Sequence, residues 1–158
     1  MNRPSSFTIV VAALAVDRLL KWWVGGHLVL YESRPLIGQT IRLTRVHNVG
    51  GALGIFPDSG PLFLAVSIVV SAVIVFLLLR HKTQGVIMGT GLALLLGGAV
   101  GNLIDRLAYG YVLDFLEIRG LFVNNFADVC VSVGTALIFI HVLFGGEKDR
   151  TTQEADRL

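Results

Sequence analysis

The sequence predicts a mainly α-helical membrane protein, with four transmembrane helices and a small extracytoplasmic subdomain of β-sheet and half-helix. Hydrophobic residues make up 54% of the 158 residues and charged residues 15%, whereas a soluble domain carries about 25% charged residues. Four apolar runs each approach the ~20 residues that cross a bilayer core. The two longer connections carry strand and turn signals. We therefore expect residues 1–158 to form one integral membrane domain.

The predicted spans cover about residues 7–24, 62–79, 86–104 and 127–144. The second is the clearest because it contains no charged residue. The first resembles a secretory signal peptide, with a small-residue site at Ala13–Ala15. Asp17 and Lys21 follow with the spacing of a helical ion pair, however, and Trp22 and Trp23 are typical of a membrane interface. We expect this span to remain uncleaved.

Basic residues in short loops predict the orientation of the chain. Arg80 and Lys82 place the loop between the second and third spans in the cytoplasm, together with both termini and a polar tail at 145–158. The outer face then receives the connections at about 25–61 and 105–126. Five arginines fall on that side against the rule: Arg34, Arg42, Arg45, Arg106 and Arg119.

The outer connections contain more than loops. Ile41–Val46 mostly alternates between apolar and polar residues, which is a strand signal. It leads into a turn at Asn48–Gly51 and then into the apolar stretch Ala52–Phe56. Val112–Ile118 is a second extended segment. We expect a small amphipathic sheet and a half-helix on the outer surface.

Small residues within the spans predict close packing between helices. Gly97 and Gly101 form a small-xxx-small pair, as do Gly85 and Gly89. Cys130 lies in an apolar run, where a packing role is more plausible than a nucleophilic one. We expect none of these residues to take part in catalysis.

Composition excludes several classes of function. A single cysteine rules out a disulfide framework and a multi-cysteine metal site. The four histidines lack metal-ligand spacing, so we expect no metal. The net charge is +2, and no basic stripe with interleaved aromatic residues occurs, so nucleic acid is not an expected partner.

Asp105 ends the third span, with Asn102 and Arg106 on the same helix face. A carboxylate near hydrocarbon costs free energy unless it lines a cavity, finds a partner or performs chemistry. We expect Asp105, beside Arg106, to remain ionised within a capping and salt-bridge cluster at the helix end.

Asp114 and Asp128 are the candidates for catalysis. Asn124 or Asn125 can cap the fourth helix, which places Asp128 in its first turn, where the helix dipole favours a carboxylate. Asp114 lies in an apolar extended segment without a local cation. Two carboxylates brought together cannot both ionise readily, so one keeps a proton. One then activates water and the other polarises a carbonyl, as in an aspartic peptidase. A proton-coupled carrier is the rival interpretation.

Five stretches match a known family in the family's order, and with the four-span layout they cover nearly the whole chain. They are Asp17–Lys21, Asn48–Ala52, Gly101–Arg106, Gly110–Phe115 and Asn125–Asp128. The last three at this spacing are highly specific. The chain resembles the bacterial lipoprotein signal peptidases, also called signal peptidase II.

The resemblance implies an intramembrane aspartic endopeptidase of the bacterial cytoplasmic (inner) membrane, acting near the outer leaflet without metal or organic cofactor. Its substrates would be diacylglyceryl-modified prolipoproteins, cut just before the lipidated cysteine, and globomycin-type inhibitors would bind it. The catalytic pair falls on Asp114 and Asp128. Supporting or substrate-binding positions fall on Asp17, Lys21, Asn48, Gly50, Asn102, Asp105, Arg106 and Asn125. We expect a monomer surrounded by membrane lipids.

The chain departs from the family pattern outside the predicted dyad. Arg18 stands where glutamine is common, and Gly51-Ala52-Leu53 stands where Ala-Ala-Phe is common. The Gly50-Gly51 turn with Ala52–Phe56 is a candidate for a mobile lid or, equally, for a static interfacial anchor. The alternative functions are a small proton-coupled membrane carrier and a non-enzymatic lipoprotein assembly factor.

Overall fold

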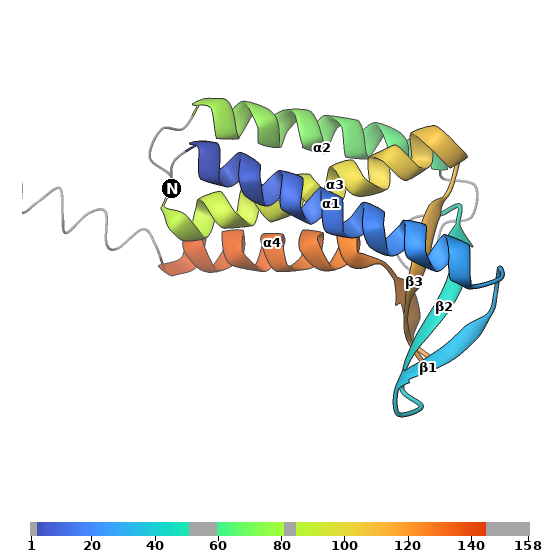
Figure 1. The fold of residues 1–158 in the computed structure, drawn as a ribbon. Helices are drawn as coiled ribbons and strands as arrows, with labels where there is room; N and C mark the ends of the chain where they lie inside the picture. Colours follow the sequence, from blue (N-terminus) through green and yellow to red (C-terminus); the bar gives the residue numbers. More distant parts are fainter. Residues whose placement is uncertain (1–2, 51–59, 81–84, 145–158) are drawn as a thin grey trace, which may run out of the picture.

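A computed structural model describes residues 3–50, 60–80 and 85–144. Within these ranges the chain forms four helices and four strands (Figure 1). In chain order they are α1 (Arg3–His27), β1 (Ser33–Ile37), β2 (Ile41–Asn48), α2 (Gly60–Arg80), α3 (Val86–Tyr109), β3 (Val112–Ile118), β4 (Phe122–Asn124) and α4 (Phe126–Phe144).

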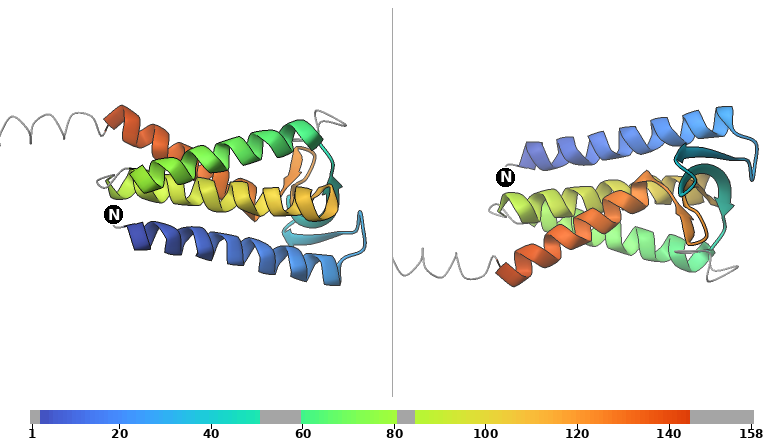
Figure 2. Two further views of the ribbon diagram at one scale, coloured as in Figure 1. Left: turned by 90° about the horizontal axis from the view of Figure 1, so that it is seen from above. Right: turned by 90° about the horizontal axis from the view of Figure 1, so that it is seen from below.

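Helix α3 is the centre of the helical layer. It packs against α1, α2 and α4, whereas α1 and α2 scarcely touch each other (Figure 2). The sheet lies at one end of the bundle, beside the end of α1 and the start of α4 (Figure 1). The start of α1 and the end of α4 lie at the opposite end. The sheet is therefore attached at one end of the bundle of apolar helices.

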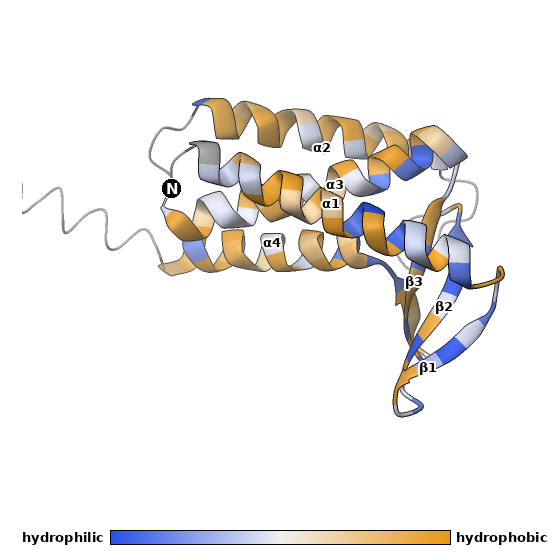
Figure 3. Ribbon diagram, in the orientation of Figure 1, coloured by the Kyte–Doolittle hydropathy of each residue, from blue (hydrophilic) through white to orange (hydrophobic). Residues whose placement is uncertain are grey.

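Among the residues that the structure describes, three helices are long and apolar enough to cross a membrane: α2, α3 and α4. Helix α1 has 25 residues, but Asp17, Arg18 and Lys21 lie in its second half. The hydrophilic residues of α1 and α3 gather at the end next to the sheet (Figure 3). A membrane crossing by α1 therefore remains a prediction.

The end of α3 differs from the prediction. The helix runs to Tyr109 rather than to residue 104, so Asp105 and Arg106 are helical and do not belong to the outer connection. Gly110 ends the helix with φ 76°, and its N–H donates to the Arg106 carbonyl at 3.1 Å. Glycine adopts this left-handed conformation without steric cost. The prediction ended the helix at residue 104, where the apolar run stops. The backbone hydrogen bonds of the helix continue for more than one turn beyond that residue.

The sheet is antiparallel in the order β1-β2-β3-β4. Strands β2 and β3 confirm the two predicted extended segments, with β2 continuing to Asn48. Strands β1 and β4 were not predicted because they are short and lack alternation. The described ranges contain no half-helix, and the stretch 52–56 lies outside them. A register shift after Leu43 aligns Val46 with Asp114, which fixes the depth of that aspartate in the sheet.

Glycines allow the backbones of α3 and its neighbours to approach closely, as predicted for Gly97 and Gly101. A Cβ atom on Gly97 would lie 2.9 Å from the Ala13 Cβ, and one on Gly101 would lie 2.8 Å from an Asp17 oxygen. The tightest contact was not predicted: a Cβ atom on Gly98 would lie 2.3 Å from the Ala127 carbonyl oxygen. Gly98 therefore sets the distance between α3 and α4.

Gly98→Ala should lower the free energy of unfolding by about 1–3 kcal/mol, because the added methyl group overlaps backbone that cannot move aside. Thermal unfolding of the purified protein in detergent measures the effect. Gly26→Ala is the matched control in α1, since a Cβ atom there meets nothing within 4 Å. Equal melting temperatures for the two variants would contradict the role assigned to Gly98.

Candidate active site

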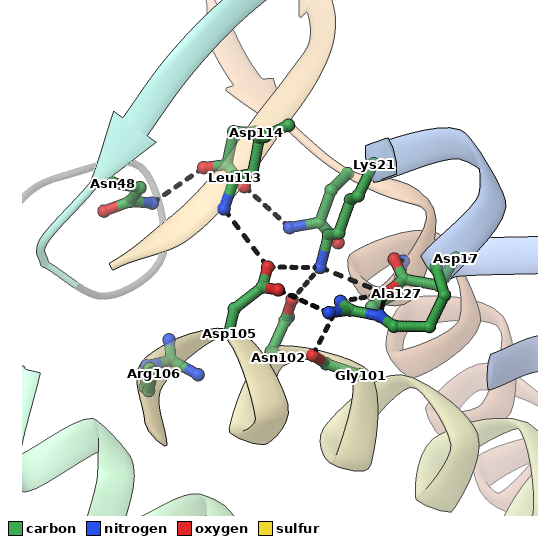
Figure 4. A network of polar contacts seen from close by, with 12 residues as sticks. Asp17, Lys21, Asn48, Gly101, Asn102, Asp105, Arg106, Leu113, Asp114 and Ala127 are labelled. Carbon is green, nitrogen blue, oxygen red and sulfur yellow. Dashed lines mark hydrogen bonds and ion pairs between the residues drawn. The ribbon is translucent and has the colours of Figure 1, made fainter. Parts of the chain in front are cut away.

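Four charged side chains meet between α1 and α3, three of them buried and the fourth, Arg18, partly exposed. Lys21 Nζ lies 3.1 Å from Asp17 Oδ2 and 2.8 Å from Asp105 Oδ2, and Arg18 lies 2.6 Å from each of the same carboxylates. Lys21 is 5% exposed, and Asp17 and Asp105 are each 1% exposed. The predicted Asp17–Lys21 pair is confirmed. Because two cations face two carboxylates, the cluster is neutral as a whole (Figure 4).

Asp105 belongs to a salt-bridge cluster at the end of α3, as predicted, but the cluster does not include Arg106. Asp105 pairs with α1 and accepts the Leu113 N–H at 3.2 Å. Arg106 Nη1 instead lies 3.4 Å from the Ser67 hydroxyl of α2. Neighbouring residues on a helix point in different directions, so these two side chains meet different helices.

Arg18, the departure from the family pattern, extends this charged cluster. Its guanidinium donates to the Gly101 carbonyl at 2.9 Å as well as to Asp17 and Asp105. One side chain therefore holds the second half of α1 against the last turns of α3. A glutamine at this position would lack the charge and three of the five N–H donors of arginine.

Asp114 extends from β3 and is 2% exposed. Its two oxygens accept the side-chain N–H groups of Asn48 at 2.8 Å and of Asn125 at 2.6 Å. Burial, together with the charge of Asp128, raises the pKa of Asp114 to about 7, against the hydrogen bonds from Asn48 and Asn125 that lower it. Asp114 is therefore partly protonated near neutral pH.

Asp128 lies in the first turn of α4 and shares Asn125 with Asp114. The Asp128 N–H donates to Asn125 Oδ1 at 3.0 Å, and the Asn125 N–H donates to Asp128 Oδ2 at 3.3 Å. This reciprocal arrangement is a capping box. Of the two predicted caps, Asn124 and Asn125, the structure has Asn125. Asn102 donates to the other oxygen of Asp128 at 2.7 Å. One residue, Asn125, thus links both carboxylates.

The orientation of each asparagine amide follows from its second partner. The Asn102 oxygen accepts from Lys21 Nζ at 3.0 Å, and the Asn48 oxygen accepts from the Gly50 N–H at 3.0 Å. The Asn125 oxygen accepts the Asp128 N–H. All three partners are donors only, so each amide must present its NH₂ group to a carboxylate. Lys21 and Gly50 therefore act on the two aspartates through asparagine.

The two carboxylates face one cavity of about 230 Å³, lined also by Asn48, Asn102 and Arg106. The space is sufficient for several waters, each of which needs at least about 10–15 Å³. No group of three His, Cys, Asp or Glu side chains suited to a metal occurs among the described residues. The cavity can therefore bring water and a carbonyl group to two carboxyl groups and one guanidinium.

The structure brings all the predicted site residues together, either at the cavity or directly behind it. Sequence reasoning missed other lining residues, including Asn124, Val131 and Ser132. Val131 and Ser132 follow Asp128 by three and four residues, so helical spacing was the signal that could have found them. The Asn124 oxygen is buried without a hydrogen-bond partner in the part of the chain described. The position of Asn124 at the cavity depends on the pairing of β4 with β3, which no local sequence pattern predicts.

The chain is similar to known proteins over most of its length. Residues 9–144 match the family described as signal peptidase (SPase) II. A lipoprotein signal peptidase of Symbiobacterium thermophilum is 36% identical over 142 residues, covering 87% of this chain and 93% of that protein. One from Desulfitobacterium hafniense is 39% identical over 140 residues, covering 88% and 93%.

A solved structure described as a bacterial membrane enzyme superposes with a TM-score of 0.83 at 26% identity, covering 89% of this chain and 88% of that one. Together with the three apolar helices, this similarity makes the chain a multi-pass membrane protein. The match to the family model spans most of the chain, and so do the matches to the curated relatives. The chain therefore belongs to the signal peptidase II family.

Proposed function

We propose that this chain is an intramembrane aspartic endopeptidase that removes the signal peptide from diacylglyceryl-modified prolipoproteins, cutting just before the lipidated cysteine. The observation that carries the chemistry is the single cavity that Asp114 and Asp128 both line, with Asn125 bonded to both. The substrate class comes from the family, since the relatives are named lipoprotein signal peptidases.

In the proposed reaction, Asp128 accepts a proton from a water in the cavity as that water attacks the scissile carbonyl carbon. Asp114, whose raised pKa keeps a proton available, donates a hydrogen bond and then the proton to the carbonyl oxygen. The tetrahedral intermediate collapses as the C–N bond breaks: the leaving amine takes the proton held by Asp128, and one hydroxyl of the intermediate returns its proton to Asp114, which restores both carboxyl groups. Poor access to bulk water strengthens these interactions.

The supporting residues set the two carboxyl groups up for different roles. Asn102, oriented by Lys21, donates to Asp128, which also lies at the positive end of the α4 dipole; both favour its ionised form. Arg106 adds a positive charge at the cavity wall. Asn48 and Asn125 hold Asp114 at the depth where β3 places it. Asp17, Asp105 and Gly50 act indirectly, through Lys21 and Asn48.

The membrane placement is part of the same proposal. All four helices cross the bacterial cytoplasmic (inner) membrane, both termini face the cytoplasm, and the sheet and cavity lie near the outer leaflet. Non-helical backbone is tolerated at that depth only where it lines a cavity or is buried in protein, as β3 does. The enzyme is a monomer in contact with lipid, and globomycin-type inhibitors occupy the same cavity.

A cleavage assay on a diacylglyceryl-modified prolipoprotein tests the function. The purified full chain should convert this precursor to a smaller product on a gel and should leave the unlipidated precursor uncut. Folded protein that cuts neither precursor would contradict the proposal. Transport that depends on Asp114 or Asp128 would then favour a proton-coupled carrier, whereas lipoprotein maturation that is insensitive to both would favour an assembly factor.

The cleavage rate should depend on the proton held by Asp114. Because its pKa is raised to about 7, the carboxyl group is protonated below that pH and ionised above it. We expect kcat/KM to fall about tenfold per pH unit above roughly pH 8. The hydrogen bond from Asn48 lowers this pKa, so Asn48→Ala should move the alkaline limb to higher pH. A flat profile, or a shift in the opposite direction, would count against this assignment.

A further inference from the structure

The arginines of the sheet place positive charge on the side of the membrane where the loop-charge rule predicts little of it. Arg34 pairs with Glu32 at 2.7 Å. Arg42 lies 3.8 Å from Glu117, which Arg119 also attracts electrostatically. Neither Arg45 nor Arg119 has a carboxylate within ion-pair distance among the described residues. Arg119 is exposed to solvent, whereas Arg45 is partly buried, so Arg45 is the partly buried sheet arginine whose charge the described chain leaves unbalanced.

Arg45 uses only part of its hydrogen-bonding capacity. Its Nη1 donates to the carbonyls of Gly25 and Leu28 at 2.9 Å each, which caps the end of α1. Its Nη2 lies 3.5 Å from His47 Nε2, and its buried Nε has no hydrogen-bond partner in the part of the chain described. Nη2 carries two N–H groups, of which His47 can accept only one, so the guanidinium can still donate a charge-assisted hydrogen bond to a carboxylate or phosphate. Burial and the charge of Arg45 lower the pKa of His47. The positive charge at this point of the sheet therefore comes from Arg45 and not from His47.

Arg45 lines a second cavity, of about 470 Å³, that is separate from the catalytic one. Tyr111 and Leu113 face this cavity, whereas Val112 and Asp114 face the catalytic cavity. Alternate residues of a strand point to opposite sides, so β3 is the wall between the two. Arg18 and Lys21 also line the second cavity but are balanced by Asp17 and Asp105. The net charge that the cavity presents therefore comes from Arg45.

The rim of the second cavity has the composition of a membrane interface. Trp22 is 76% exposed and Tyr109 is 64% exposed, and both line the cavity. Tyr111 stacks between His47 and Tyr109, with ring centroids 3.8 Å and 5.9 Å away. Amphipathic aromatic rings lie at the level of lipid headgroups. A ligand here would have its charged group among the rings and its apolar part along the helices.

We propose that the second cavity binds the phosphate headgroup of an anionic phospholipid. This cavity lies between the end of α1, the end of α3 and the face of β3 that carries Leu113. The phosphate contacts the guanidinium of Arg45, which lines the cavity, and the aromatic rim surrounds the glycerol and the ester groups. The same lipid reinforces the cap that Arg45 forms on α1, and so stabilises the helix that carries Lys21. The proposal rests on the site geometry and does not require peptidase activity.

Binding of lipid to the purified full chain in detergent tests the proposal, by native mass spectrometry with phosphatidylglycerol and phosphatidylcholine as probes. We expect the chain to bind phosphatidylglycerol more tightly than phosphatidylcholine. Arg45→Gln should weaken phosphatidylglycerol binding roughly tenfold, since a charge-assisted hydrogen bond is lost. Arg34→Gln is the matched control and should change binding little, because Arg34 is exposed and paired with Glu32.

Two further variants keep the test decisive if Arg45→Gln unfolds. Arg45→Lys keeps the charge but loses the planar guanidinium and should show intermediate affinity. Tyr109→Ala removes part of the rim and should weaken the binding of both lipids. Equal affinity for the two lipids would overturn the proposal. So would an equal loss in Arg34→Gln, which would indicate a diffuse positive surface. Displacement of the lipid by an equal concentration of inorganic phosphate would overturn the lipid assignment in favour of free phosphate.

Discussion

Asp114→Asn and Asp128→Asn should each reduce cleavage of a diacylglyceryl-modified prolipoprotein by about 10³- to 10⁴-fold, because each removes a proton-transfer step that no other group in the cavity can replace. The double variant should lose little more than either single variant, since residues that act as a unit are not additive. Single-turnover cleavage, followed by gel shift, measures all three.

Asparagine is nearly the shape of aspartate, so the variants should fold. Asp114 accepts hydrogen bonds from Asn48 and Asn125, and an amide oxygen can still accept one of them. Glu117→Gln is the matched control: it makes the same change three residues further along β3, where the carboxylate accepts from Thr44 and Ser33. It should cleave at the wild-type rate. Substantial cleavage by a folded Asp114→Asn or Asp128→Asn protein would remove that residue from the dyad.

Lys21→Met should lower the free energy of unfolding by about 3–5 kcal/mol, the cost of leaving buried carboxylates without their partner. Lys21 contacts both Asp17 and Asp105 and donates to Asn102. Its loss leaves two carboxylates facing Arg18 alone. It also frees the Asn102 amide to turn its oxygen toward Asp128, which would repel a carboxylate. Both stability and cleavage should therefore fall.

Arg34→Met is the matched control. It separates the effect of burying an ion pair from the effect of the short distance between its two charges. Arg34 Nη2 lies 2.7 Å from Glu32, a distance similar to those of the Lys21 pairs, but its side chain is 58% exposed. Exposed ion pairs contribute little, so we expect a change within about 0.5 kcal/mol. Adding Asp105→Asn to Lys21→Met restores one cation to one carboxylate and should recover part of the lost stability. Equal losses for Lys21→Met and Arg34→Met would contradict the buried network as the source of stability.

Much of the fold was predictable because its signals are local. Hydropathy located α2, α3 and α4, and alternation located β2 and β3. The spacing of Asp17 and Lys21 predicted their pairing because four residues make about one helical turn. A cap at Asn124 or Asn125 followed for the same reason, since a helix start is recognised from nearby residues, but the structure decided for Asn125.

The sequence by itself determined which residue types were available for chemistry, and the motifs around Asp114 and Asp128 identified the pair. The tertiary structure decided which side chains meet. Asp105 pairs with α1 and not with Arg106, and Gly98 rather than Gly97 makes the closest helix contact. Lys21 orients Asn102 across 81 positions in the chain. Local patterns state which face of a helix or strand a residue occupies, but the neighbour on that face depends on helix packing and strand register, which bring together residues far apart in the chain.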